Sequence, residues 1–162
     1  MLDLGPENAI KYVSRFGFNT SDFPKNLQLA FGGGTIALSP LEVATAYATF
    51  ANGGFKIEPY LIRTIDSINE EFYFQETPME LCVRDCESEV KKAMRVVEPR
   101  VAFIMNSMLS DAVKKGTARK ATRILGRQDL HGKTGTTNDS DIWFSGYTPN
   151  LVATAWAGFS DN

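Results

Sequence analysis

Apolar residues recur at helical spacing in three stretches of the chain. The first stretch covers residues 6–16, where proline suits the first turn and the following glycine suits the end of a helix. The second begins at Ser39-Pro40-Leu41-Glu42, a capping box with proline at the first helical position, and ends at Asn52-Gly53-Gly54. The third covers residues 99–115. Its predicted buried stripe consists of Val101, Ile104/Met105, Met108/Leu109 and Ala112.

Strand patterns occur in the middle of the chain and in its last third. Residues 59–68 are rich in β-branched and aromatic side chains, and a turn at Asn69-Glu70 predicts a hairpin with residues 71–75. Residues 130–137, 142–148 and 151–159 predict three more strands, and Pro149-Asn150 makes the last pair antiparallel. The last strand is apolar nearly throughout, which predicts cover on both faces. The pattern indicates an α+β fold, an antiparallel sheet packed with helices.

Between the two strand regions, residues 76–98 contain ten charged residues among twenty-three and show no steady period. This pattern predicts a polar surface loop whose charges are solvated. Cys82 and Cys86, the two cysteines of the chain, fall in this segment. They are either two thiols or a local disulfide, and a disulfide requires a loop because i, i+4 spacing on a helix holds the Cβ atoms too far apart. A metal site would need further ligands, and the single histidine, His131, is distant in sequence.

Composition narrows the class of protein. A chain of 162 residues suffices for one domain with a core, and 43% apolar with 22% charged residues describes a globular protein. The net charge of −2 gives no sign of nucleic-acid or anionic-membrane binding. No apolar run approaches the roughly 20 residues of a membrane span, and the N-terminus is not a signal peptide. We therefore expect any exporting segment to lie outside this chain.

The residues with the clearest potential for ligand binding are 132–137, Gly-Lys-Thr-Gly-Thr-Thr. Lysine supplies a compact positive charge, threonine supplies hydroxyl donors, and glycine admits a ligand close to the backbone. This combination predicts a site for a small anion such as a carboxylate. A phosphate-binding P-loop would need a glycine at position 127, which is Arg127, and a helix directly afterwards, where the pattern predicts a strand. Upstream, the basic residues 117–125 predict a short helix or loop on the rim of a cleft.

Several segments together resemble one known family. They are residues 116–121 (Gly-Thr-Ala-Arg-Lys-Ala), 132–139, 141–147 (Asp-Ile-Trp-Phe-Ser-Gly-Tyr), 33–35, 38–42 and 46–54. The Lys-Thr-Gly element and its surroundings resemble the class A (bifunctional) penicillin-binding proteins, 1A type, in the second half of their transpeptidase domain. The similarity covers essentially the whole chain, so residues 1–162 are interpreted as a partial transpeptidase domain with the serine β-lactamase-like fold.

The resemblance implies a peptidoglycan D,D-transpeptidase on the periplasmic face of the cytoplasmic membrane, anchored through a segment absent from this chain. A serine attacks the D-Ala-D-Ala carbonyl, and β-lactams acylate the same serine. By position, Lys133 contributes positive charge to the catalytic site. Thr134 and Thr136 bond the terminal carboxylate, the Thr136 N–H is an oxyanion donor, and Gly135 leaves the strand edge bare. The implied partners are stem peptides, β-lactams and the N-terminal half of the domain, with no cofactor, metal or nucleic acid.

Thr137 and Asn138 extend the same element, as substrate-binding or as ordinary strand-end residues. The chain departs from the family where the nucleophile is concerned. Ser88-Glu89-Val90-Lys91 matches Ser-x-x-Lys only formally, because Ser88 lies among glutamates, and Ser67-Ile68-Asn69 precedes it in the wrong order. We therefore expect a fragment that is inactive alone. The alternatives are a β-lactamase or D,D-carboxypeptidase relative and a non-catalytic module that binds a carboxylate or peptide.

Overall fold

The computed structural model describes residues 3–32, 36–68, 72–82, 91–137 and 141–159. The N-terminal part contains helices α1 (Pro6–Val13), η1 (Ser14–Phe16), η2 (Leu27–Phe31) and α2 (Pro40–Ala51). The middle contains strands β1 (Phe55–Lys56), β2 (Thr64–Asp66), β3 (Phe72–Gln75), β4 (Glu80–Leu81) and β5 (Lys92–Arg95). The last part contains helices α3 (Pro99–Lys114) and α4 (Arg119–Leu125) and strands β6 (His131–Thr137), β7 (Asp141–Thr148) and β8 (Leu151–Gly158).

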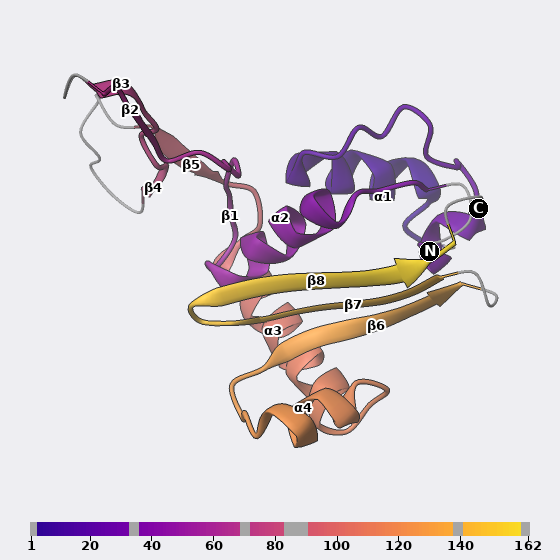
Figure 1. Ribbon diagram of the computed structural model, residues 1–162. Helices are drawn as coiled ribbons and strands as arrows, with labels where there is room; N and C mark the ends of the chain where they lie inside the picture. The colour runs from indigo at the N-terminus through magenta and orange to yellow at the C-terminus, as the bar shows by residue number, and fades with distance from the viewer. Residues whose placement is uncertain (1–2, 33–35, 69–71, 83–90, 138–140, 160–162) are drawn as a thin grey trace.

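The C-terminal strands form an antiparallel sheet in the order β6-β7-β8. Pro149 and Asn150 form the two-residue turn between β7 and β8, as the sequence predicts. Helix α2 packs against β7 and β8, and α3 packs against β6 (Figure 1). The prediction of an α+β fold with helices on an antiparallel sheet is confirmed. Strand β6, which carries the Lys-Thr-Gly element, lies at one edge of this sheet.

Helix α2 begins with the predicted capping box. Ser39 Oγ accepts a hydrogen bond from the Glu42 backbone N–H at 3.2 Å, and the Glu42 carboxylate accepts from the Ser39 N–H at 2.8 Å. These backbone and hydroxyl donors of Ser39 lower the pKa of Glu42. The box therefore satisfies two backbone donors that the first turn of a helix otherwise leaves open.

Replacing this cap should destabilise the protein in a pH-dependent way. We expect Ser39→Ala to lower the free energy of unfolding by about 1 kcal/mol at neutral pH. Because the pKa of Glu42 is lowered in the folded state, its contribution is present above the unfolded pKa and is lost as pH falls through the folded value. Urea unfolding of the parent and of Ser39→Ala at pH 7 and at pH 3 measures the loss of unfolding free energy at each pH. An equal loss at both pH values would contradict the role of Glu42.

Helix α3 buries only part of the predicted stripe. Ala102, Leu109 and Val113 are buried, whereas Val101, Ile104 and Met108 are 40%, 57% and 60% exposed. The apolar stripe of α3 is wider than its neighbours cover. Ala102 packs with Ala46 of α2, and Val113 packs with Leu130 beside the sheet. The prediction is correct for Leu109, which is buried, and for Met105 and Ala112, which are partly buried. It is wrong for the other predicted residues, which form an apolar strip of α3 that faces outward.

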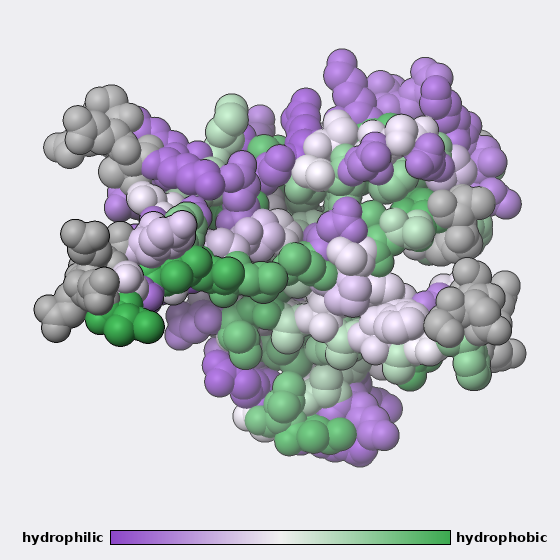
Figure 2. Space-filling model, turned by 45° about the horizontal axis from the view of Figure 1, so that its top comes forward, coloured by the Kyte–Doolittle hydropathy of each residue, from purple (hydrophilic) through white to green (hydrophobic). Residues whose placement is uncertain are grey.

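The prediction that β8 is covered on both faces is also wrong. Val152 and Thr154 are partly buried on the face that α2 covers. Ala153, Ala155 and Ala157 alternate with them and are exposed. Figure 2 shows bands of apolar side chains across this view of the molecule, including its lower end, where α4 lies. Within the part of the chain that the structure describes, no element covers the second face of β8.

The middle of the chain forms an arm that projects away from the C-terminal sheet (Figure 1). The predicted hairpin is present as β2 and β3, although β2 contains only three of the residues in 59–68. The predicted loop 76–98 contains two strands, because β5 pairs with both β1 and β4 and buries Ala93. Cys82 is disulfide-bonded. Cys86, the other cysteine considered for a disulfide, lies outside the described residues.

Candidate functional site

Among the described residues, strand β6 pairs with β7 along one edge and with no strand along the other. Its register with β7 pairs Lys133 with Ser145, Gly135 with Trp143 and Thr137 with Asp141. Because side chains alternate along a strand, Lys133, Gly135 and Thr137 share one face, and Thr134 and Thr136 share the other. An edge strand also directs alternate N–H and C=O groups away from the sheet, where a ligand can bind them.

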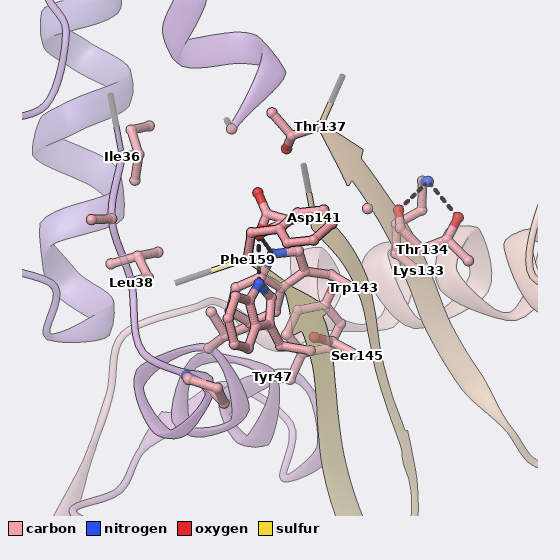
Figure 3. A pocket seen from close by; sticks show the side chains of 16 residues that line it. Ile36, Leu38, Tyr47, Lys133, Thr134, Thr137, Asp141, Trp143, Ser145 and Phe159 are labelled. Carbon is pink, nitrogen blue, oxygen red and sulfur yellow. Dashed lines mark hydrogen bonds between the residues drawn. The ribbon is translucent and has the colours of Figure 1, made fainter. Parts of the chain in front are cut away.

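The side chain of Lys133 reaches the backbone of the next residue. Its Nζ donates a hydrogen bond to the Thr134 carbonyl oxygen at 2.8 Å and to Thr134 Oγ1 at 3.5 Å (Figure 3). Among the described residues, no carboxylate lies within ion-pair distance of Lys133, whereas Lys91, Lys115 and Arg127 all have such partners. Within the part of the chain that the structure describes, Lys133 therefore presents a positive charge without an acidic partner, at the strand that also carries the threonine hydroxyls.

Glycines allow close packing around β6. Gly132 pairs with Gly146 across the strands, and the ring of Phe144 lies over this pair. A Cβ on Gly132 would lie 2.7 Å from the Ser145 carbonyl oxygen, so a larger residue there would force the strands to shift. A Cβ on Gly135 would lie 3.2 Å from the Cβ of Trp143. Gly132 and Gly135, which flank Lys133-Thr134, thus have a packing role in addition to any role toward a ligand.

A cavity of about 760 Å³ lies between this sheet face and the segment that leads into α2. Lys133, Thr134, Gly135 and Thr137 line one side, and Ile36 and Leu38 line another (Figure 3). Asp141 lies at the sheet end of the cavity and accepts hydrogen bonds from the indole N–H groups of Trp143, at 3.3 Å, and Trp156. The Asp141 carboxylate therefore fixes the positions of the two indole rings that line the cavity.

At the opposite end of the cavity, Ser145 belongs to a cluster of buried polar and aromatic side chains. Thr154 Oγ1 donates to Ser145 Oγ at 3.0 Å, and Ser145 is only 4% exposed. Tyr147 stacks on the ring of His131 and donates its hydroxyl hydrogen bond to Asn106 Oδ1 of α3. Burial, with Tyr47 nearby, raises the pKa of Tyr147 above its ordinary value, so the phenol stays protonated and keeps this bond.

Thr117 also contacts the site, although it lies 17 residues before Thr134. The two hydroxyl oxygens are 2.8 Å apart. The sequence contained one signal, the glycine of Gly116-Thr117-Ala118 after a helix, which predicts a turn but not its partner. Helix α4 follows this turn and begins with Arg119 and Lys120, which agrees with the predicted basic helix or loop.

The structure brings some predicted residues together and not others. Lys133, Thr134, Gly135 and Thr137 line the cavity, while Thr136 follows on the same strand and does not line it. Ser67 lies after β2 in the projecting arm, far from β6 (Figure 1). Ser88 and Asn138 lie outside the described residues. No group of three potential metal ligands occurs among the residues that the structure describes.

Comparison with known proteins identifies the family. The family model described as "Penicillin binding protein transpeptidase domain" matches residues 2–159. The chain belongs to this family. This result confirms the family suggested by the Lys-Thr-Gly element and its neighbouring segments. Across residues 3–32, 36–68, 72–82, 91–137 and 141–159, none of the helices has the length and hydropathy that crossing a bilayer requires.

Two curated relatives and one solved structure of the 1A type are similar to this penicillin-binding protein segment. The chain is 38% identical to "Penicillin-binding protein 1A" of Pseudomonas aeruginosa, over 96% of this chain and 23% of the relative. It is also 38% identical to the Neisseria flavescens protein of the same name, over 98% of this chain and 19% of the relative. The crystal structure of penicillin-binding protein 1A from Haemophilus influenzae matches with a TM-score of 0.86 and 33% identity, over 97% of this chain and 27% of that one.

A more distant structure shares only the fold. The D,D-transpeptidase domain of a peptidoglycan glycosyltransferase from Eggerthella lenta matches with a TM-score of 0.71 and 24% identity, over 98% of this chain and 45% of that one. The chain thus spans about a fifth of the length of the curated relatives it matches. Activities of the whole relatives therefore do not transfer directly to this segment.

Proposed function

We propose that this chain is part of a peptidoglycan D,D-transpeptidase and forms one wall of its active site. The observation that carries the proposal is the charge of Lys133, which has no acidic partner among the described residues, on an edge strand beside the hydroxyl of Thr134. An edge strand can align an extended peptide along its backbone, and lysine with threonine hydroxyls can hold a terminal carboxylate. A stem peptide that ends in D-Ala-D-Ala has both features.

Each residue of the strand has a proposed role. Lys133 supplies positive charge to the catalytic site, and Thr134 and Thr136, on one face of β6, donate hydroxyl hydrogen bonds to the carboxylate. Thr137, on the face of β6 that Lys133 occupies, adds a further hydroxyl for the substrate at the strand end, opposite Asp141 in the register. The backbone N–H of Thr136 is the proposed oxyanion donor, a type of interaction whose loss costs about 2.7–4 kcal/mol of activation free energy. Gly135 keeps the strand surface low where the substrate backbone passes.

The nucleophilic serine is proposed to come from the N-terminal half of the same domain, which lies outside these 162 residues. The outward apolar strip of α3 and the exposed alanines of β8 are surfaces that this half can cover. We further propose that the complete enzyme is held at the periplasmic face of the cytoplasmic membrane by a segment outside this chain. β-Lactams would then acylate the complete site and not this chain alone.

Intact mass spectrometry after incubation with benzylpenicillin tests the proposal. We expect a covalent adduct on the complete transpeptidase and none on the 162-residue chain. An adduct on the chain alone would contradict the proposed division of the site, and peptide mapping would then identify the serine. Ser145, which pairs with Lys133 in the sheet register, and Ser88 are the positions to inspect. A complete enzyme without any adduct would contradict the transpeptidase assignment itself.

A further inference from the structure

Thr117 belongs to a turn that is fixed independently of its own side chain. Ala118 is 3% exposed and packs with Val113 and Leu130 in the core between α3, α4 and the sheet. The Ala118 N–H donates to the Ala112 carbonyl at 3.2 Å, and Thr122 Oγ1 donates to the Val113 carbonyl at 2.7 Å. The turn therefore has a buried anchor on one side of Thr117, while Thr117 itself is exposed and presents its hydroxyl to β6.

The hydroxyl of Thr134 has a limited set of hydrogen bonds. It carries one proton and two acceptor positions. Lys133 Nζ, which can only donate, lies 3.5 Å from Thr134 Oγ1 and uses one acceptor position. Thr117 Oγ1, at 2.8 Å, can use the other. When both acceptor positions are occupied in this way, the single proton of Thr134 points to neither neighbour and is available to a third group.

We infer that Thr117 is a positioning residue that orients the Thr134 proton toward the carboxylate of the bound ligand. The inference rests on the proposed function, which places a terminal carboxylate at Thr134. With the anion present, donation from Thr117 to Thr134 is the favoured direction, because the opposite direction would turn a lone pair of Thr134 toward a negative charge. A hydrogen bond from Thr117 also polarises the Thr134 hydroxyl and strengthens its donation to the ligand.

The effect should depend on the charge of the ligand group. A hydroxyl that only supports the turn would matter equally for any ligand, whereas a hydroxyl that orients a donor matters most when the acceptor is a carboxylate. Hydrogen bonds to ionised groups are stronger than those between neutral groups. Thr117 should therefore contribute to the discrimination between a free carboxylate and its uncharged derivative. It should affect ligand binding before acylation and leave the acylation step itself nearly unchanged.

The test uses the complete transpeptidase that contains this chain. Thr117→Val removes the hydroxyl and keeps the shape, and Thr117→Ser restores the hydroxyl. The ligands are benzylpenicillin and its methyl ester. For each ligand, the kinetics of acylation separate the dissociation constant of the initial complex from the acylation rate. We expect Thr117→Val to weaken binding of benzylpenicillin about 3- to 10-fold, with little effect on the ester, and Thr117→Ser to recover most of the loss. Thermal unfolding of both variants reports on the turn.

Two results would overturn the inference. In the first, Thr117→Val weakens the binding of benzylpenicillin and of its ester equally. In the second, the Thr117→Val enzyme binds both ligands like the parent, while the Lys133→Met enzyme loses the preference for the free carboxylate. The second result would leave the proposed function intact. If neither Lys133→Met nor Thr117→Val changes the preference for the free carboxylate, the proposed function fails as well, because the anion is then bound elsewhere.

Discussion

Replacing Lys133 with methionine should reduce acylation of the complete transpeptidase by benzylpenicillin about 10- to 150-fold, because hydrogen bonds to charged groups contribute about 1.5–3 kcal/mol. Methionine is unbranched and only one heavy atom shorter than lysine, and it removes the charge and the donors. Among the described residues Lys133 has no acidic partner to be left behind, so the substitution does not create an unpaired carboxylate. The second-order rate of acylation measures the effect, with folding checked by thermal unfolding.

A matched lysine separates this effect from a general loss of positive charge. Lys115 lies at the end of α3, is highly exposed and pairs with Asp111 at 3.1 Å. An exposed i, i+4 ion pair contributes little to stability. Neither Lys115 nor Asp111 lines the cavity. Lys115→Met should therefore leave acylation within about twofold of the parent. Equal losses for the two variants would indicate that Lys133 acts only through the net charge of the protein.

The sequence predicted the elements of the C-terminal sheet because their signals are local. Strand boundaries, the Pro149-Asn150 turn and the capping box at Ser39 each depend on neighbouring residues, and the structure has all three. The Lys-Thr-Gly element lies on its predicted strand for the same reason. The roles assigned to Lys133 and the threonines stay predictions, since they depend on a ligand and on a nucleophile from outside this chain.

The errors concern contacts between distant elements. On α3, both halves of a wide apolar stripe have helical spacing, and spacing alone does not distinguish the buried half from the half that faces outward. On β8, an apolar composition indicated cover on both faces, yet the described elements cover one. Similarly, Lys92–Arg95 reads as part of a charged loop, but pairing with β1 and β4 makes it a strand. The Thr117–Thr134 contact was likewise not predicted, because it joins the turn before α4 to strand β6, 17 residues further along the chain.

The largest effect on stability is expected at Gly54, where α2 connects to β1. Gly54 has a φ of +108°, and a Cβ there would lie 2.2 Å from the Val97 carbonyl oxygen. Its own carbonyl accepts hydrogen bonds from the N–H groups of Val96 and Val97, so the backbone segments are already in contact. We expect Gly54→Ala to lower the free energy of unfolding by about 3–5 kcal/mol, the combined effect of backbone strain and overpacking.

The neighbouring glycine provides the control for this prediction. Gly53 has a φ of +81°, but a Cβ there would meet no atom within 4 Å. Gly53→Ala should therefore cost only the left-handed conformation, about 1–2 kcal/mol. Urea unfolding of the two variants beside the parent measures the difference, which reports the contact with Val97 together with the difference between the two backbone conformations. Because Val97 packs with Phe16, Ala46 and Ala102 in one core cluster, a shift at Gly54 would loosen α2 from α3. Equal losses of unfolding free energy for the two variants would mean that the backbone at Gly54 and Val97 moves apart easily to accept a methyl group. The core around Val97 would then not fix α2 relative to the rest of the fold.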